Sequence, residues 1–475
     1  MRTTNLCIIR GATILGNCSW QCSSCCPATP SLTHDLTVKW LHLRMAAHPN
    51  SNASMAGSEG TPAQNVSQRL AELHRCVRRD VPDASVGRRA SLPSHALLQA
   101  LSKRMHDELS LVLYPFPRGA LHPPEIHAGS SGNLGYAVES AWLERLRKWP
   151  RRIEVAAAGP AACPSHGSPR CLFYVPFSGL ACRFSMRSMA ARSALAPCQR
   201  LMANATRTLA HRWPGLLARR NGSDHFWVSA HDFGKQFGAL ADRRLLDNGH
   251  CIANSAFWHY SATRFRPMRD VASVPCVASL PHDAPPPSEA RPTLAFFAGS
   301  VENGRHVREH LETGIAAWQK KAGARAVRPI RWHHSSIGFE AHRRELRKSV
   351  FCLCPAGHEP WSPRLVEAIL AGCIPVVLAD VYVLPLRCFV EWSTFAVLVP
   401  EAEAMRVPER LAAFSTADIN AMQRALLQVR RYFAHTSSSG ASSLDAFTLG
   451  MLELWLKMQE ETPTVPRFHA HTFAG

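Results

Sequence analysis

The chain has 475 residues, of which 54 are Lys or Arg and 35 are Asp or Glu, so its formal net charge is +19. Hydrophobic residues make up 46% of the chain, which is enough for two or three packed domains and excludes a collagen-like repeat, a small disulfide scaffold and disorder throughout. The basic residues are mostly Arg and are spread along the chain, and no nucleic-acid-binding module accompanies them. The sequence therefore predicts no nucleic-acid partner.

The first segment, residues 1–104, lacks sustained hydrophobic periodicity and is rich in Ser, Ala, Pro and His. This composition predicts a disordered, low-complexity stem or targeting region. No window of about 20 apolar residues is free of charge and proline, so a membrane anchor is not visible in the sequence. The 16 cysteines suit an oxidising compartment, and acceptor sites for N-linked glycans permit passage through the secretory pathway; these sites are Asn17, Asn52, Asn65, Asn204 and Asn221.

Short apolar runs that end in proline or polar residues predict strands in the segment 105–280. The runs are 111–114, 171–175 and 225–229, and apolar positions at helical spacing predict a helix over 136–148. Strands that alternate with helices favour an α/β fold with a mainly parallel sheet. We expect this segment to form one Rossmann-like half.

A proline-rich linker, residues 281–290, then precedes a second segment in which the pattern starts again. Strands are predicted at 293–298, 349–354 and 374–379, and a helix over 305–320. We expect a second Rossmann-like half over 291–435, followed by a C-terminal helix and tail over 436–475. The predicted fold class is α/β, with two Rossmann-like halves.

One β-loop-α-β unit of the second half carries clear helix boundary signals. Ser362 suits the N-cap of a short helix, Pro363 its first position and Gly372 its C-terminal stop. Helix N-termini after parallel strands have free backbone N–H groups that hold anions. The loop from Pro355 to Trp361 leads into this helix, so we expect a ligand site there.

Polar residues at this helix start have the chemistry of a nucleotide site. The guanidinium of Arg364 can fork onto a diphosphate, and Glu367, three residues further on, can accept hydrogen bonds from ribose hydroxyls. Gly299 follows the first strand of this half and lets a backbone approach the ligand closely. An Arg and a Glu at this spacing are more often a solvated pair on a helix surface, so the spacing alone leaves that alternative open.

The sequence also resembles the exostosin-like glycosyltransferases, and the plant and algal branch of cell-wall enzymes is the most similar. The resemblance spans roughly residues 110–435 and rests on motifs whose order and spacing match. They are Phe173–Phe177, Asp224–Phe226 with His231–Asp232, Phe265–Pro267 with Arg269–Asp270, Phe296–Gly299, Phe351–His358, Ser362–Ile369, Ala371–Val377 and Val383–Pro385.

This resemblance implies two facing Rossmann-like domains of the GT-B type, with the nucleotide sugar in the C-terminal half and the acceptor in the N-terminal half. It implies transfer of a sugar, with inversion and without a bound metal or other cofactor, from a UDP-sugar to a polysaccharide or glycoprotein. It also implies a Golgi enzyme associated with the membrane or with other glycosyltransferases. The alternative is a catalytically inactive carbohydrate-binding or complex-stabilising subunit with the same fold.

An inverting transfer needs a base for the acceptor hydroxyl. His231 and Asp232 are the first candidates because they follow a predicted strand of the acceptor half, and Asp224 with His225 comes next. For each of them the alternative is a structural hydrogen bond at a strand end. No Asp-x-Asp clamp follows a candidate strand, so no metal site is predicted. Cys352 and Cys354 alternate on one strand, which favours buried packing.

Overall fold

We describe the protein from a computed structural model. It describes residues 62–78, 93–115, 137–155, 170–185, 191–213, 219–232, 243–256, 265–277, 285–302, 306–323, 328–436 and 443–459, with a few shorter pieces. The chain divides into two compact units, residues 1–60 and 61–475. In the first unit only a short antiparallel pair, β1 (Cys7–Ile9) and β2 (Ala12–Ile14), is described. All that follows concerns the second unit.

The N-terminal half is built on a six-stranded, fully parallel sheet. Its spatial order is β4-β3-β5-β6-β7-β8, so the winding direction reverses between β3 and β5. The central strand β6 is buried along its whole length, as expected for a parallel sheet that is covered on both faces. The strands are β3 (Leu109–Leu113), β4 (Arg152–Glu154), β5 (Arg170–Tyr174), β6 (His225–Ser229), β7 (His250–Ala253) and β8 (Val271–Ala272).

The C-terminal half contains a five-stranded parallel sheet in the order β10-β9-β11-β12-β13. Its winding direction reverses between β9 and β11, at the position that corresponds to β3 and β5 in the first half. Two parallel α/β sheets, one in each half, confirm the predicted fold class. The strands are β9 (Thr293–Ala298), β10 (Ile330–His333), β11 (Ser349–Pro355), β12 (Ile374–Leu378) and β13 (Val397–Leu398).

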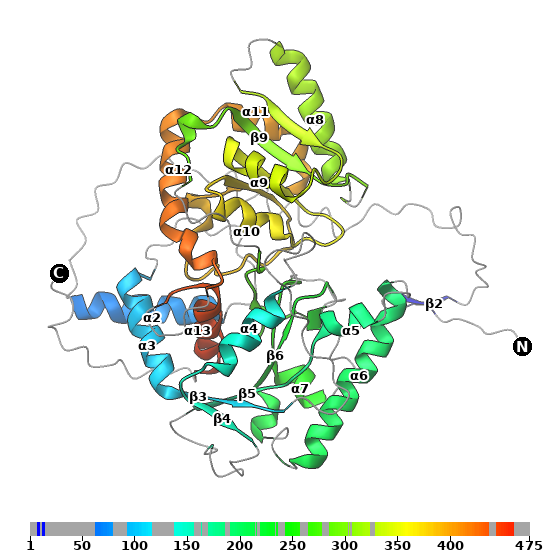
Figure 1. The fold of residues 1–475 in the computed structure, drawn as a ribbon, viewed down its shortest axis with the longest axis vertical. Coiled ribbons are helices and arrows are strands. Elements are labelled where there is room, and N and C mark those ends of the chain that lie inside the picture. The colour runs from blue at the N-terminus through cyan, green and yellow to red at the C-terminus, as the bar shows by residue number, and fades with distance from the viewer. Residues whose placement is uncertain are drawn as a thin grey trace, which may run out of the picture. The chain divides into compact units, whose positions relative to one another are not determined.

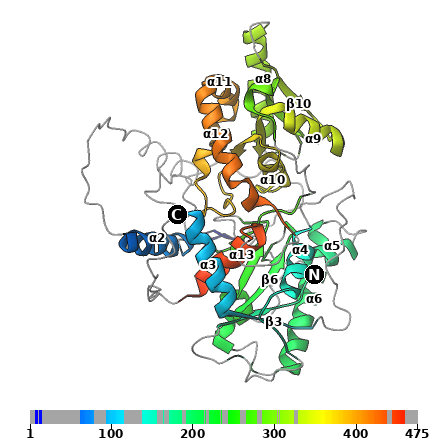
Figure 2. The same ribbon diagram turned by 60° about the vertical axis from the view of Figure 1, so that its left-hand side comes forward.

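Helices cover both sheets, and Figures 1 and 2 show the N-terminal half in cyan and green and the C-terminal half in yellow and orange. The first half contains α4 (Val138–Arg147), α5 (Gly179–Ser185), α6 (Ala191–Arg212) and α7 (Arg243–Asn248). The second contains α8 (Val307–Ala322), α9 (Phe339–Lys348), α10 (Pro363–Leu370), α11 (Val407–Ala412) and α12 (Thr416–Val429).

The prediction of a stem that extends to residue 104 is wrong in part. Residues 62–77 form helix α2 (Pro62–Val77), and α3 (His95–Glu108) begins at an N-cap, Ser94, whose hydroxyl accepts a hydrogen bond from Leu97 N. Leu70, Leu73 and Val77 are buried. The composition of this segment concealed two amphipathic helices between polar stretches. Apart from β1 and β2, most of the rest of the predicted stem lies outside the described residues.

The C-terminal helix, α13 (Ala446–Met458), packs on the N-terminal half, and Figures 1 and 2 both show it, in red, beside α3. Its N-cap is Asp445, which forms a buried ion pair with Arg145 of α4. The ring of Phe447 lies 4.8 Å from that of Trp142. The chain therefore returns to its first half after completing the second.

Part of the predicted linker is packed. Ser288 is buried, and its hydroxyl donates to Asn420 of α12. The guanidinium of Arg291, which is fully buried, donates to four carbonyl oxygens: those of Pro286, Leu346, Ser349 and Ala371. Because these carbonyls come from the linker and from the ends of α9 and α10, Arg291 fixes the entry into the second sheet.

Four disulfides join the described residues: Cys76–Cys388, Cys163–Cys171, Cys182–Cys198 and Cys352–Cys373. Cys352 and Cys354 are both buried, as expected; Cys352 in addition forms a disulfide that the sequence analysis did not predict, whereas Cys354 is a free thiol. The Cys76–Cys388 bond links α2 to the second half across 312 residues of sequence. A bond of this kind confirms that α2 belongs to the folded unit.

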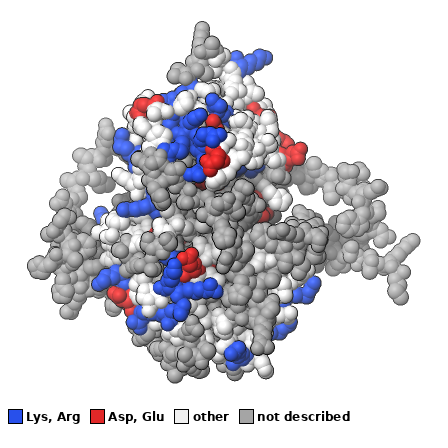
Figure 3. All heavy atoms as spheres, in the orientation of Figure 1, with Lys and Arg blue, Asp and Glu red and all other residues white. Residues whose placement is uncertain are grey.

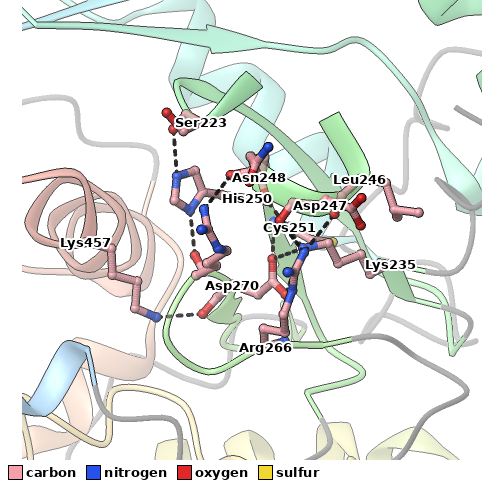
Figure 4. A network of polar contacts seen from close by, with 12 residues as sticks. Ser223, Lys235, Leu246, Asp247, Asn248, His250, Cys251, Arg266, Asp270 and Lys457 are labelled. Carbon is pink, nitrogen blue, oxygen red and sulfur yellow. Dashed lines mark hydrogen bonds and ion pairs between the residues drawn. The ribbon is translucent and has the colours of Figure 1, made fainter. Parts of the chain in front are cut away.

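Asp270 is the centre of a buried polar network at the end of the first half (Figure 4). Its carboxylate accepts from Lys235 Nζ at 2.8 and 3.1 Å, from Cys251 N at 2.9 Å and from Arg266 N at 2.7 Å. Lys457 of α13 donates to the carbonyl oxygen of Asp270 at 2.6 Å. The Arg266 and Asp270 motif positions thus hold β7, β8 and α13 together, which is a structural role.

Candidate active site

The helix start at Ser362 is built as the sequence predicts. Ser362 has extended backbone angles, and its hydroxyl accepts from Arg364 N at 3.3 Å. Gly372 has a φ of +67°, a left-handed conformation that ends the helix and favours glycine. The site therefore stands on a capped helix directly after β11, at the carboxyl edge of the sheet.

Arg364 is held at this edge by neutral oxygen atoms. Its guanidinium donates to Ser362 Oγ at 3.1 Å and to the carbonyl oxygen of Ala298, the last residue of β9, at 2.9 Å. Its Nε is buried and has no hydrogen-bond partner among the described residues. A buried donor without a partner on a cation is an expected feature of a site that an anionic ligand completes.

A second arginine, Arg308 of α8, lies next to Arg364 and was missed by the sequence analysis. Arg308 is 7% exposed, and its guanidinium donates to the carbonyl oxygens of Ala356, at 3.1 Å, and of Ser300. Burial, together with the nearby charge of Arg364, lowers the pKa of Arg308 to about 10. It therefore remains charged at neutral pH, under the electrostatic influence of a second cation.

Both guanidinium groups pack on the ring of Phe297, with the Arg308 carbon 5.3 Å and the Arg364 carbon 4.9 Å from the ring centroid. Among the described residues no acidic side chain pairs with either arginine. A buried cation and a half-buried one that share a ring and have no counter-ion are costly unless a ligand neutralises them. We call Arg308 and Arg364 the arginine pair; it fits a diphosphate, which carries two negative groups.

Glycines make room for the arginine pair. A Cβ on Gly299 would lie 2.9 Å from Arg364 Nη2, and a Cβ on Gly357 would lie 2.4 Å from Arg308 Nη2. Both distances are shorter than real Cβ contacts. Gly299, which we expected to admit a ligand, thus admits the side chain of Arg364.

Glu367 lies on α10 as predicted and is 24% exposed. Its Oε2 is 3.2 Å from Nε2 of His342, a residue of α9 whose ring packs on that of Phe296 at 5.3 Å. Glu367 therefore has a protein partner in this structure, and its second oxygen, Oε1, lies outside this pair. Its expected contact with a ribose remains a prediction.

His231 and Asp232 follow β6 at the carboxyl edge of the first sheet, as predicted. His231 is 8% exposed, and its carbonyl oxygen accepts from Gly234 N and from Ser255 Oγ. Asp232 is half-buried, and its Oδ1 accepts from Nε1 of Trp361 at 2.9 Å. This bond brings Asp232 next to the loop that precedes Arg364, so the structure joins the two predicted sites.

Asp224 and His225 do not lie at the carboxyl edge of the first sheet. They lie at the amino end of β6, separated from its carboxyl end by about 13 Å of strand. Both are fully buried in a hydrogen-bonded row in which Arg219 Nε donates to Asp224, Asp224 pairs with His225 Nδ1, and His225 Nε2 contacts the hydroxyl of Tyr114. The structure thus contradicts their selection as candidate bases, because only residues beyond a carboxyl end face the ligand edge.

The first half contains a buried acidic residue, Glu139, that the sequence analysis also missed. Its carboxylate is 1% exposed and accepts from Ser178 Oγ, Leu180 N and Ala230 N. Ser178 and Leu180 lie at the start of α5, just after β5. Burial raises the pKa of Glu139 to about 7, although these hydrogen bonds oppose the shift.

The two halves therefore differ at their corresponding winding reversals. In the first half the carboxylate of Glu139 already occupies the start of the helix that follows β5. In the second half the helix after β11 presents Arg364, which together with Arg308 of α8 has no acidic partner among the described residues. This difference favours the second half as the site of an anionic ligand.

The surface of the second half also carries positive charge. In Figure 3, Lys and Arg side chains gather in the upper part of the molecule, where Figure 1 places α9. Four basic residues lie on this helix: Arg343, Arg344, Arg347 and Lys348. A positive surface on the half that contains the arginine pair favours the approach of anionic ligands.

Among the described residues, no cluster of three or more His, Cys, Asp or Glu side chains could hold a metal ion. Among the same residues we find no helix long and apolar enough to span a bilayer.

Two α/β halves, each with a parallel sheet, are the architecture of the GT-B class of fold. Residues 162–414, more than half of the chain, match the family model for the Exostosin GT47 domain. The chain therefore belongs to the Exostosin GT47 family.

Several curated relatives of the chain are plant proteins. The chain is 30% identical over 269 residues to a probable glucuronoxylan glucuronosyltransferase and 28% identical over 391 residues to "Probable glycosyltransferase At5g25310", both of Arabidopsis thaliana. These alignments cover 54% and 80% of this chain and 55% and 72% of the relatives. The chain thus spans about half the length of the first of these relatives.

Solved structures give a weaker likeness. "Crystal Structure Analysis of the Glycotransferase of kitacinnamycin" is 14% identical and superposes with a TM-score of 0.31 over 74% of this chain and 99% of that one. "Crystal structure of Anabaena Alr3699/HepE in complex with UDP" is 8% identical, with a TM-score of 0.31 over 72% of this chain and 97% of that one. We draw nothing about the site from scores this low.

Proposed function

We propose that the protein transfers a sugar from a nucleoside diphosphate sugar to a hydroxyl group of a glycan or glycoprotein. The observation that carries this proposal is the arginine pair, the buried Arg308 and the half-buried Arg364, whose guanidinium groups pack on the ring of Phe297 without an acidic partner among the described residues. A leaving diphosphate gains charge in the transition state, so a preorganised pair of cations stabilises that state more than the substrate. Membership of the Exostosin GT47 family supports this chemistry.

We propose that transfer inverts the anomeric carbon in a single displacement. Asp232 and His231 would supply the base that takes the acceptor proton, because they lie beyond β6 and because Asp232 contacts the loop before Arg364. The arginine pair and the start of α10 would hold the departing diphosphate. On this proposal no metal ion takes part, since two fixed cations supply the charge that a divalent ion would supply.

UDP is the nucleotide that we propose for the donor. The experiment is isothermal calorimetry with UDP, GDP and ADP on the full chain, in 5 to 10 mM EDTA, followed by turnover of a panel of UDP-sugars. The panel includes UDP-glucuronic acid, because several relatives are named as glucuronosyltransferases. Binding of UDP that needs Mn²⁺ or Mg²⁺ would contradict the metal-free proposal, and binding of UDP without any turnover would favour the inactive subunit.

We also propose that the protein matures in the secretory pathway and acts in the Golgi on a wall polysaccharide or a glycoprotein. Four disulfides support an oxidising compartment. Asn221, in the acceptor sequence Asn221-Gly222-Ser223, is exposed in a turn. After expression in a secretory host, an N-glycosidase should reduce the mass of the wild type by one more glycan than that of Asn221→Gln.

A further inference from the structure

A hydrogen bond joins the two halves of the candidate site. Nε1 of Trp361 donates to Oδ1 of Asp232 at 2.9 Å. Trp361 is the last residue of the loop that follows β11, and Asp232 lies just beyond β6. The bond therefore connects the loop that carries the arginine site to the carboxylate of a candidate base.

The indole end of this bond is held firmly. Trp361 is 6% exposed and immediately precedes Ser362, the N-cap that binds Arg364 N. Trp361 and Arg364 thus belong to one loop and helix start. An indole ring has only two rotatable side-chain bonds and a donor but no acceptor, so a buried Trp can orient an acceptor at low entropic cost.

The backbone that carries Asp232 is also fixed, on its other side. Ala230 N donates to Glu139 at 2.9 Å, and Asn254 Nδ2 donates to the carbonyl oxygen of Ala230 at 3.1 Å. Ser255 Oγ donates to the carbonyl oxygen of His231 at 3.2 Å. These bonds fix the main chain up to His231, whereas the bond from Trp361 fixes the carboxylate itself.

We propose that Trp361 is a positioning residue for proton transfer: its N–H group orients the carboxylate of Asp232 beside the donor site. This inference rests on the proposed function, in which Asp232 takes the acceptor proton. The same hydrogen bond also fixes the position of the Asp232 carboxylate relative to the loop that leads into Arg364.

The test is Trp361→Phe, which keeps an aromatic ring and removes the donor. The probes are UDP for binding and, for turnover, UDP-glucuronic acid with xylan, or the best substrate of the UDP-sugar panel. We expect kcat to fall about ten- to a hundredfold, because a hydrogen bond to a charged group is lost. The Kd for UDP should stay within twofold of the wild type, since the arginine pair is unchanged.

A double-mutant cycle separates positioning from a general structural effect. In an Asp232→Asn background, Trp361→Phe should change kcat by less than threefold, because the base that Trp361 positions is already absent. Equal losses in both backgrounds would overturn the proposal, and so would a wild-type kcat for the single variant. If Trp361→Phe does not fold, indole NMR of the wild type decides: the Trp361 Nε1–H resonance should shift in Asp232→Ala, and an unchanged resonance would overturn the contact on which the proposal depends.

The matched control is Trp455→Phe on α13. Trp455 is 2% exposed, and its Nε1 has no hydrogen-bond partner among the described residues. This variant should leave kcat unchanged. A wild type that binds no UDP would show instead that the proposed function is wrong, and that outcome is distinguished by calorimetry before any variant is made.

Discussion

Arg308 and Arg364 come from different helices and share one aromatic ring, that of Phe297, on which their guanidinium groups lie 5.3 and 4.9 Å from the centroid. Each is bonded to neutral oxygen atoms, and neither has an acidic partner in the described part of the chain. The protein thus holds two positive charges together before any ligand binds. Preorganisation of this kind predicts a strong dependence of nucleotide affinity on both side chains.

The first prediction concerns that affinity. Arg364→Ala should abolish UDP binding in calorimetry, and Arg364→Lys should restore it poorly, because an ammonium group cannot fork onto two phosphate oxygens. Arg308→Ala should weaken binding at least tenfold. Arg410→Ala is the control, because Arg410 lies on α11 and pairs with Glu403. If either alanine variant of the pair binds UDP as the wild type does, the assignment of the donor site is wrong.

The second prediction concerns proton transfer. Replacing His231 or Asp232 by Asn should lower kcat by about two to four orders of magnitude, the usual contribution of a general base, with UDP affinity unchanged. His225→Phe is the comparison, since His225 lies at the opposite end of β6 and should affect stability more than rate. Wild-type rates in both Asn variants would show that these two residues are structural. Loss of UDP affinity would show that the assignment of the base to the first half and of the nucleotide to the second half is wrong.

The third prediction is a pH dependence of stability that arises from Glu139. Burial raises its pKa from 4.5 to about 7 in the folded protein. A raised pKa means that the folded state binds the proton more tightly, so the contribution to stability is full below pH 4.5 and is lost as the pH rises through about 7. Between these values the free energy of unfolding should fall by up to about 1.4 kcal/mol per pH unit from this group.

Glu139→Gln, which does not titrate, removes this contribution. Buried histidines such as His250, whose pKa is lowered by burial, change stability with the opposite sign, so the difference between the wild type and Glu139→Gln is the quantity to measure. Urea unfolding at pH 5, 6, 7 and 8 gives that difference. A difference that stays constant over this range would contradict a raised pKa for Glu139.

The fourth prediction concerns the network around Asp270. Asp270→Asn removes the carboxylate that pairs with Lys235, which is 1% exposed, and a buried charge without its partner costs roughly 3–5 kcal/mol. Urea unfolding should show a loss of about that size. Glu144→Gln is the control, because the Glu144–Lys148 pair is exposed at 57% and 47% and should contribute less than about 1 kcal/mol. Equal effects of the two substitutions would contradict a buried ion pair at Asp270.

Much of the fold follows from local patterns in the sequence. The apolar runs predict β6 and β9 at their observed bounds, and Ser362 and Gly372 mark the two ends of α10. Strand-forming apolar runs and helix caps depend on neighbouring residues, so one sequence is enough to locate them. Arg364 was found in this way, because a helix start after a buried strand is a recognisable anion site.

Tertiary structure decided which residues join Arg364. Arg308 is 56 positions away in the chain and reaches the site because β9 and β11 are neighbours in the sheet, a pairing that no local pattern specifies. Trp361 and Asp232 are 129 positions apart in the chain, and the tertiary structure likewise brings them into contact. Asp224 and Asp232 look alike as polar residues near a strand, but the direction of β6 places them at opposite edges. Sequence patterns identify side chains that can do chemistry, whereas strand order and direction determine which of them meet.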